Sequence, residues 1–176
     1  RSTMNALRTI TLVLATGVAA WSATSPVGGS LPAAEAEQVL YMKQEEKLAR
    51  DVYQALAKRW SAPIFERIAA AEHRHLEAVD VLVARYGLKD PAPAEPGRFS
   101  IPDLQRLHDE LVASGSVSLA RAVAAGIAVE QADIDDLEEV LATARTPAVV
   151  RVMSHLRAAS GRHLDAFQAA AARLEA

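Results

Sequence analysis

Apolar side chains recur every three or four positions along four long stretches of the chain. Residues three, four and seven positions apart lie on one face of an α-helix, so each stretch predicts an amphipathic helix with one buried face. The predicted long helices cover 35–60, 64–86, 117–144 and 148–174, and a shorter one covers 102–113. Alternating patterns typical of strands are nearly absent outside the N-terminal segment. The chain is therefore predicted to be all-α.

The lengths of the connections predict how these helices are arranged. Those that follow Trp60 and Ala144 are only a few residues long, so each joins two helices into an antiparallel hairpin. The connection 87–116 is long enough to run the length of a bundle and contains the short helix. Two hairpins joined by one long crossover are the plan of a ferritin-like antiparallel four-helix bundle.

The N-terminal segment has the layout of a bacterial secretory signal. A short positive stretch precedes an apolar run from Ile10 to Trp21, which is short for a membrane span, and small residues follow. We expect a signal segment at 1–23, a flexible linker at 24–34 and the bundle domain at 35–176. After cleavage no stable membrane span would be left, and the protein would be periplasmic or extracellular. An uncleaved N-terminal anchor is the alternative.

Composition narrows the classes of function. A formal net charge of −3 gives no basic footprint for nucleic acid. Hydrophobic residues make up 51% of the chain but aromatic residues only 5%, a mixture that favours closely packed helices. The chain contains no cysteine, which excludes disulfides, thiolate metal ligands and cysteine nucleophiles.

Each long helix carries acidic or imidazole side chains in the middle of its apolar face. These candidate metal ligands are Glu46, Glu72, His75, Glu130, Asp133 and His163. Because each lies near the midpoint of its helix, a rise of 1.5 Å per residue places them in one layer within about 5 Å of the bundle centre. A buried, unpaired carboxylate costs several kcal/mol, and four would also repel each other. Two divalent metal ions are the simplest compensation.

Particular segments also resemble known families. Glu46-Lys-Leu-Ala-Arg-Asp-Val-Tyr53 resembles the first-helix motif of rubrerythrins, and Glu72-His-Arg-His75 resembles their Glu-x-x-His. Residues 38–170 more closely resemble an uncharacterised ferritin-like family known only as a domain of unknown function, whose last motif corresponds to Ser160-Gly-Arg-His163. The resemblance implies a ferritin-like fold and a dinuclear metal centre, with no established substrate.

One position departs from the dimetal pattern. Ser160 stands where a glutamate of the fourth helix belongs, and Asp133, one turn after Glu130, is the candidate replacement. With Asp133, four carboxylates would balance the charge of two divalent ions. If Asp133 instead faces solvent, a mononuclear site or an unusual metal is expected. Iron is the first choice by resemblance, and manganese, zinc and copper are compatible with these residue types.

Several neighbouring residues have alternative interpretations. Glu45 is the alternative ligand to Glu46, whose apolar face is longer. Arg50 is expected to pair with Asp51 on the helix surface or to anchor a ligand from outside the metal sphere. Tyr53, two turns from Glu46, is expected to pack rather than to act in redox chemistry. We expect His73, His108 and His155 to lie outside the centre.

Three functions are compatible with this sequence. The first is a dimetal oxidoreductase of the ferroxidase or peroxidase type, acting on O2 or peroxide with an external electron donor, since no cysteine supplies an internal one. The second is a non-catalytic periplasmic protein that scavenges, senses or delivers metal. The third is a metal-free helical interaction module. The oligomeric state is open, with a homodimer as one alternative.

Overall fold

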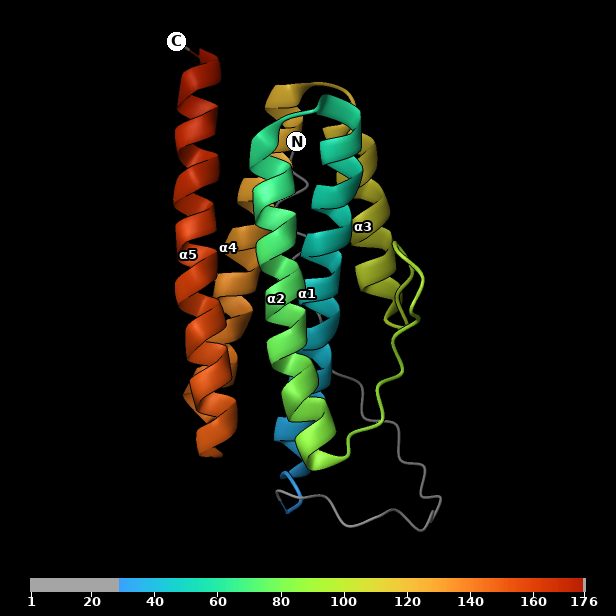
Figure 1. Cartoon of the computed structure of the whole chain (residues 1–176), viewed down its shortest axis with the longest axis vertical. Helices are drawn as coiled ribbons and strands as arrows, with labels where there is room; N and C mark the ends of the chain where they lie inside the picture. Colours follow the sequence, from blue (N-terminus) through green and yellow to red (C-terminus); the bar gives the residue numbers. More distant parts are fainter. Residues whose placement is uncertain (1–28, 176) are drawn as a thin grey trace.

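The computed structural model describes residues 29–175, and every regular element in that part of the chain is helical (Figure 1). The elements are α1 (Ala33–Trp60), α2 (Pro63–Tyr86), α3 (Pro102–Gly115), α4 (Leu119–Thr143) and α5 (Pro147–Glu175). The all-α prediction is confirmed, with helix ends close to the expected ones. The predicted signal segment, 1–23, lies outside the described residues.

Local chemistry explains where the helices begin and end. Proline is the first residue of α2, α3 and α5. At that position a backbone N–H has no acceptor within the helix, so its absence costs nothing, and the fixed φ of proline suits the first turn. The Ser118 hydroxyl accepts the N–H of Arg121 at 3.2 Å and caps the start of α4. Gly87, with φ at 61°, ends α2 in the left-handed conformation that glycine adopts without strain.

The five helices form two antiparallel hairpins and one crossover (Figure 1). The first hairpin pairs α1 with α2, and the second pairs α4 with α5. The crossover, 87–101 followed by α3, places α3 against α1 and α4. This is the predicted arrangement. Within residues 29–175, none of the helices combines the length and apolar character needed to cross a membrane.

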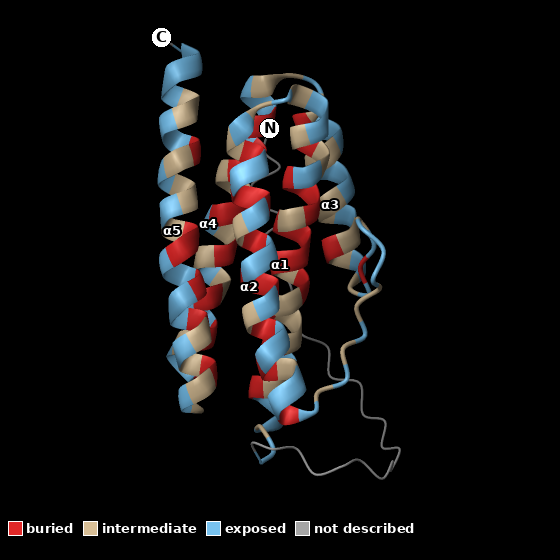
Figure 2. Cartoon of the chain, in the orientation of Figure 1, coloured by how far each residue is buried: buried red, intermediate tan, exposed pale blue. Residues whose placement is uncertain are grey.

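Buried residues recur along all four long helices (Figure 2). The apolar ones form two clusters, with a polar layer between them. One cluster includes Leu56, Phe65 and Phe167, and the other includes Met42 and Leu156. On each long helix the residues of the polar layer fall between those of the two clusters; they are Glu46, Glu72 with His75, Glu130 with Asp133, and Ser160 with His163. The functional candidates are therefore held between two hydrophobic cores.

Close helix packing accounts for one glycine of α4. A Cβ on Gly126 would meet the ring of Phe167 at 2.6 Å. That ring packs with Tyr53 and Phe65, at centroid separations of 5.2 Å and 5.6 Å. Gly126 thus lets α4 approach the aromatic group that lies beside the polar layer.

A second face of α1 holds the crossover through polar contacts. Buried Lys47 donates to the carbonyls of Glu95 and Arg98 at 2.9 Å and 3.1 Å and pairs with Asp51 at 2.7 Å. Asp51 also accepts the N–H of Gly97 at 2.8 Å, and this contact accounts for its low exposure of 4%. The prediction of an Asp51 surface pair was wrong, because the loop covers that face.

Replacing Asp51 by alanine is expected to lower the free energy of unfolding by about 3 kcal/mol, because buried Lys47 would lose its counter-ion. Urea unfolding of the variant measures the loss. The matched control is Asp103→Ala, which removes a more exposed pair with Arg106 and should cost less than about 1 kcal/mol. Equal losses in the two variants would contradict a special role for Asp51.

The start of α1 contacts the start of α5. Buried Glu35 accepts the N–H groups of Arg145 and Thr146 at 3.0 Å and 3.2 Å, just before α5 begins. Burial opposes its charge, but these donors lower the pKa of Glu35 below its usual value. Leu31 packs against the second apolar cluster, so the predicted flexible linker ends earlier than residue 34.

We expect Glu35→Gln to lower the free energy of unfolding by about 1 kcal/mol at neutral pH, the typical value of a capping interaction. Because the folded-state pKa is lowered, this contribution is present above the unfolded pKa and is lost as pH falls through the folded pKa. Chemical denaturation at pH 7 and at acidic pH tests both statements. Exposed Glu37→Gln should leave the unfolding free energy unchanged.

Candidate metal centre

The polar layer brings together side chains from four helices. Glu46 comes from α1, Glu72 and His75 from α2, and Glu130 from α4; none of the four is more than 5% exposed. His163 of α5 completes the set, with a side chain 13% exposed. These five residues form two groups whose potential ligand atoms lie within 4.8 Å of one another.

The first group is formed by the α1–α2 hairpin alone. The Nδ1 atom of His75 lies 3.1 Å from Oε2 of Glu46 and 2.6 Å from Oε2 of Glu72. Glu72 and His75 meet because positions three apart share a helix face. Two carboxylates and one imidazole thus converge on one point.

The second group joins the two hairpins. The Nδ1 atom of His163 lies 2.7 Å from Oε1 of Glu72 and 3.5 Å from Oε2 of Glu130. Glu72 belongs to both groups, with one carboxylate oxygen facing each imidazole. The His75 and His163 rings are stacked with centroids 5.4 Å apart. Glu72 is therefore placed to bridge two ions.

Several atoms in this layer are buried without a hydrogen-bond partner among the described residues. They are Oε1 of Glu46, Oε1 of Glu72 and Nδ1 of His163. The last two are 2.7 Å apart, yet their alignment is not that of a hydrogen bond. Polar atoms left unpaired in a protein interior are costly. Carboxylate oxygens and imidazole nitrogens that converge in this way fit the donor set of a divalent cation with mixed oxygen and nitrogen ligands.

The carboxylates perturb each other strongly when no cation is present. Burial, together with the charges of Asp133 and Glu72, raises the pKa of Glu46 well above its usual value. Burial also raises the pKa of Glu130 to about 7, with Glu72 adding to the effect. Burial would raise the pKa of Glu72 too, but contacts with His163 and His75 lower it to about 2. The site thus has one carboxylate that stays ionised and others that resist ionisation.

The imidazole of α5 is affected in the opposite sense. Burial disfavours its charged form, but the neighbouring Glu130 and Glu72 carboxylates raise the pKa of His163 to about 10. Without metal, a protonated His163 therefore supplies positive charge to this layer. A metal ion bound at Nδ1 would replace that proton.

Tyr53 packs in the aromatic group, as predicted, and also contacts the centre. Its hydroxyl donates to Oε1 of Glu130 at 2.7 Å, and the residue is fully buried. The distance of Tyr53 from Glu46 along α1 does not prevent this contact, because Glu130 belongs to α4. This hydrogen bond orients Glu130 with its other oxygen toward His163.

Asp133 lies beside the two groups rather than within them. It is 7% exposed, and its Oδ2 accepts the hydroxyl of Ser160 at 2.6 Å. Ser160 of α5 stands where the dimetal pattern has a glutamate. It is thus hydrogen-bonded to Asp133, the residue predicted to supply the missing carboxylate. Whether Asp133 binds metal stays a prediction.

The remaining candidates lie farther out. Glu46, not Glu45, belongs to a three-residue group. Arg50 donates to Asp51 at 2.6 Å, which is the predicted pairing and not the alternative in which it anchors a ligand. His73 is exposed on α2, and exposed His155 lies with its ring 6.4 Å from that of His75.

Fold and site together define a class: an all-α bundle whose central layer is a carboxylate–histidine cluster built from both hairpins. Residues 35–173 match the model of a family described as "Uncharacterized protein domain (DUF2202)", and the chain belongs to that family. The resemblance to a family known as a domain of unknown function is thereby confirmed.

A relative and a solved structure agree with this assignment. The "Uncharacterized protein MJ0754" of Methanocaldococcus jannaschii is 37% identical over 134 residues, which cover 76% of this chain and 72% of the relative. The crystal structure of the hypothetical protein MJ0754 from Methanococcus jannaschii matches with a TM-score of 0.82 and 32% identity. That match covers 87% of this chain and 88% of the other. The similarity supports the helical fold over nearly the whole described region.

Proposed function

We propose that this protein is an exported metalloprotein with a dinuclear centre, most simply of iron, that acts as an oxidoreductase on O2 or peroxide. The observation that carries the proposal is Glu72, whose two oxygens face two imidazoles in two overlapping ligand groups. A carboxylate in that position is placed to hold two ions together.

The residues of the chain would divide the binding between them. Glu46, Glu72 and His75 would hold one ion, and Glu72, Glu130 and His163 the other. Two such ions would supply electron exchange with O2 or peroxide. Three protein ligands for each ion are fewer than the six that iron or manganese commonly takes, which leaves positions for substrate.

Neighbouring side chains would set the orientation and protonation of these ligands. Tyr53 holds Glu130 through Oε1 and leaves Oε2 for the centre. Outer partners of this kind fix ligand orientation and tune affinity. The proton on Nδ1 of His163 must leave before that atom binds an ion. Electrons would come from an external donor, since the chain has no cysteine.

Metal storage or delivery without turnover is the second candidate. Glu46, Glu72 and Glu130 are each no more than 2% exposed, a degree of burial that favours retention of ions. Both candidates use the same ligands. They differ in whether the loaded protein accelerates ferrous oxidation or peroxide consumption.

Metal content and turnover test the proposal together. The chain is purified without chelators or a histidine tag, its metals are counted by mass spectrometry, and rates with O2 and with peroxide are measured. Two ions per chain with a rate above that of free iron support the oxidoreductase. Two ions without rate enhancement favour storage or delivery. No metal, with thermal unfolding unchanged by added ions, would refute both.

Export is tested separately, because residues 1–23 carry that part of the proposal. Expression in a bacterial host followed by periplasmic fractionation and N-terminal sequencing is expected to give a processed periplasmic chain. An unprocessed chain recovered only from the cytoplasm would contradict it.

A further inference from the structure

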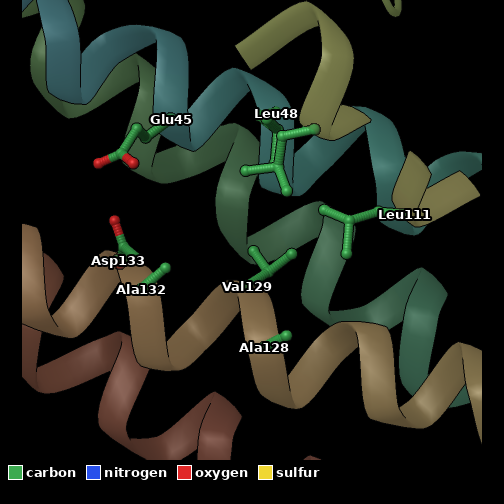
Figure 3. Close-up of a pocket in the computed structure, with 8 residues that line it drawn as sticks. Glu45, Leu48, Leu111, Ala128, Val129, Ala132 and Asp133 are labelled. Atoms are coloured by element: carbon green, nitrogen blue, oxygen red, sulfur yellow. The ribbon is translucent and has the colours of Figure 1, made fainter. Parts of the chain in front are cut away.

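A small cavity lies beside the candidate centre, between α1, α3 and α4 (Figure 3). Leu48, Leu111 and Val129 are among its apolar walls, and Glu45 and Asp133 face each other at one end. Its free volume of about 20 Å³ suits a water molecule or a monatomic ion rather than an organic ligand.

The two carboxyl groups of this cavity are each held by a hydroxyl group. Tyr41 donates to Oε1 of Glu45 at 3.2 Å, and Ser160 donates to Oδ2 of Asp133 at 2.6 Å. The other oxygens, Oε2 of Glu45 and Oδ1 of Asp133, are buried without a hydrogen-bond partner among the described residues. Each residue thus has one oriented oxygen and one free oxygen.

The surroundings add negative rather than positive charge. The Tyr41 hydroxyl also lies 3.5 Å from Oδ2 of Asp136, a third carboxylate. Within residues 29–175, neither Glu45 nor Asp133 has an ion pair with a lysine, arginine or histidine. Two carboxylates whose free oxygens are buried at one cavity are unstable in the ionised state unless a cation or a proton compensates their charge.

We propose that Glu45 and Asp133 form a third cation site, separate from the dinuclear centre, that takes a hard divalent ion such as Mn²⁺. All protein donors here are oxygen atoms, whereas each group of the centre includes an imidazole nitrogen. Oxygen-only sites suit magnesium, calcium and manganese. This third site extends the proposed function. It depends on that proposal only in assuming that the neighbouring ligand groups hold two metal ions.

The difference in donor chemistry allows a direct test. The full chain receives two equivalents of Zn²⁺, which binds mixed nitrogen and oxygen sites more tightly than Mn²⁺ does. Mn²⁺ is then titrated, and its binding is followed by the loss of the free-ion EPR signal. We expect one Mn²⁺ per wild-type chain in addition to two Zn²⁺.

Two isosteric variants locate the site. Glu45→Gln and Asp133→Asn are each expected to weaken Mn²⁺ binding at least tenfold while two Zn²⁺ remain bound. The matched control, Asp135→Asn, changes an exposed aspartate of α4, the helix that carries Asp133, and should bind Mn²⁺ like the wild type. Thermal unfolding of the metal-free variants checks that each is folded.

The remaining outcomes separate this proposal from that of the dinuclear centre. No Mn²⁺ bound to the Zn²⁺-filled wild type would overturn the third site. Loss of one Zn²⁺ in Asp133→Asn would also overturn it, because Asp133 would then belong to the centre. One Mn²⁺ that depends on Glu45, without Zn²⁺ binding, would support the third site and refute the dinuclear centre.

Discussion

Glu72→Gln is expected to remove both metal ions, because Glu72 alone belongs to both ligand groups. A neutral amide supplies neither the charge nor the second anionic oxygen that a bridge requires. Mutation of a residue that only hydrogen-bonds to a metal ligand lowers metal affinity by up to about 100-fold. Loss of a ligand shared by two ions should therefore lower the affinity for each ion by more than that factor. Metal counting and calorimetric titration of the variant measure the effect.

The histidine variants should behave differently. His75→Ala is expected to impair the first group and His163→Ala the second, so each should retain one ion more tightly than Glu72→Gln retains either. Glu77→Gln, an exposed glutamate of the same helix, is the control and should bind both ions normally. Retention of two ions by Glu72→Gln would exclude this centre as the metal site.

The metal-free and metal-loaded proteins are expected to respond to pH in opposite directions. Without metal, the raised pKa values of Glu130, about 7, and His163, about 10, mean that both groups hold protons more tightly when folded. Their contributions are complete below the unfolded pKa values and are lost as pH rises through the folded ones. Deprotonation of Glu130 in the folded protein should lower the free energy of unfolding by roughly 2–3 kcal/mol between pH 5 and pH 8.

The lowered pKa of Glu72 affects the free energy of unfolding at acidic pH. Its contribution is present above its ordinary value of 4.5 and is lost as pH falls toward about 2. The metal-free bundle should therefore be most stable near pH 5. Metal ligands must be deprotonated, so the loaded protein should gain stability over the range in which the metal-free protein loses it. Urea unfolding at several pH values, with chelator or with metal, tests this; parallel pH profiles would contradict it.

The make-up of the polar layer could be predicted because it obeys helix periodicity. Glu46, Glu72, Glu130 and His163 each interrupt an apolar stripe near the middle of a helix, and spacing alone places them inward. The short connections determined the hairpins, and the long one determined the crossover. These inferences require only the geometry of single helices and the lengths of loops.

Contacts between elements could not be read from the same pattern. The Tyr53–Glu130 hydrogen bond depends on the offset between α1 and α4, which periodicity does not give. The surface pairing predicted for Asp51 was wrong, because helix periodicity does not say which loop covers that face of α1. A signal was present: Gln44, Lys47 and Asp51 are three and four residues apart, and all three contact the segment 95–100.

The division of ligands between the hairpins has a mechanical consequence. An ion in the first group would bind α1 and α2, which a tight turn already connects, whereas an ion in the second would tie α2 to α4 and α5 across the whole crossover. Such a tie restricts the unfolded chain as a covalent cross-link between distant residues does, and the restriction grows with the loop enclosed. In a chain with no cysteine, the second ion would take the place of a disulfide, one that a chelator rather than a reductant can open.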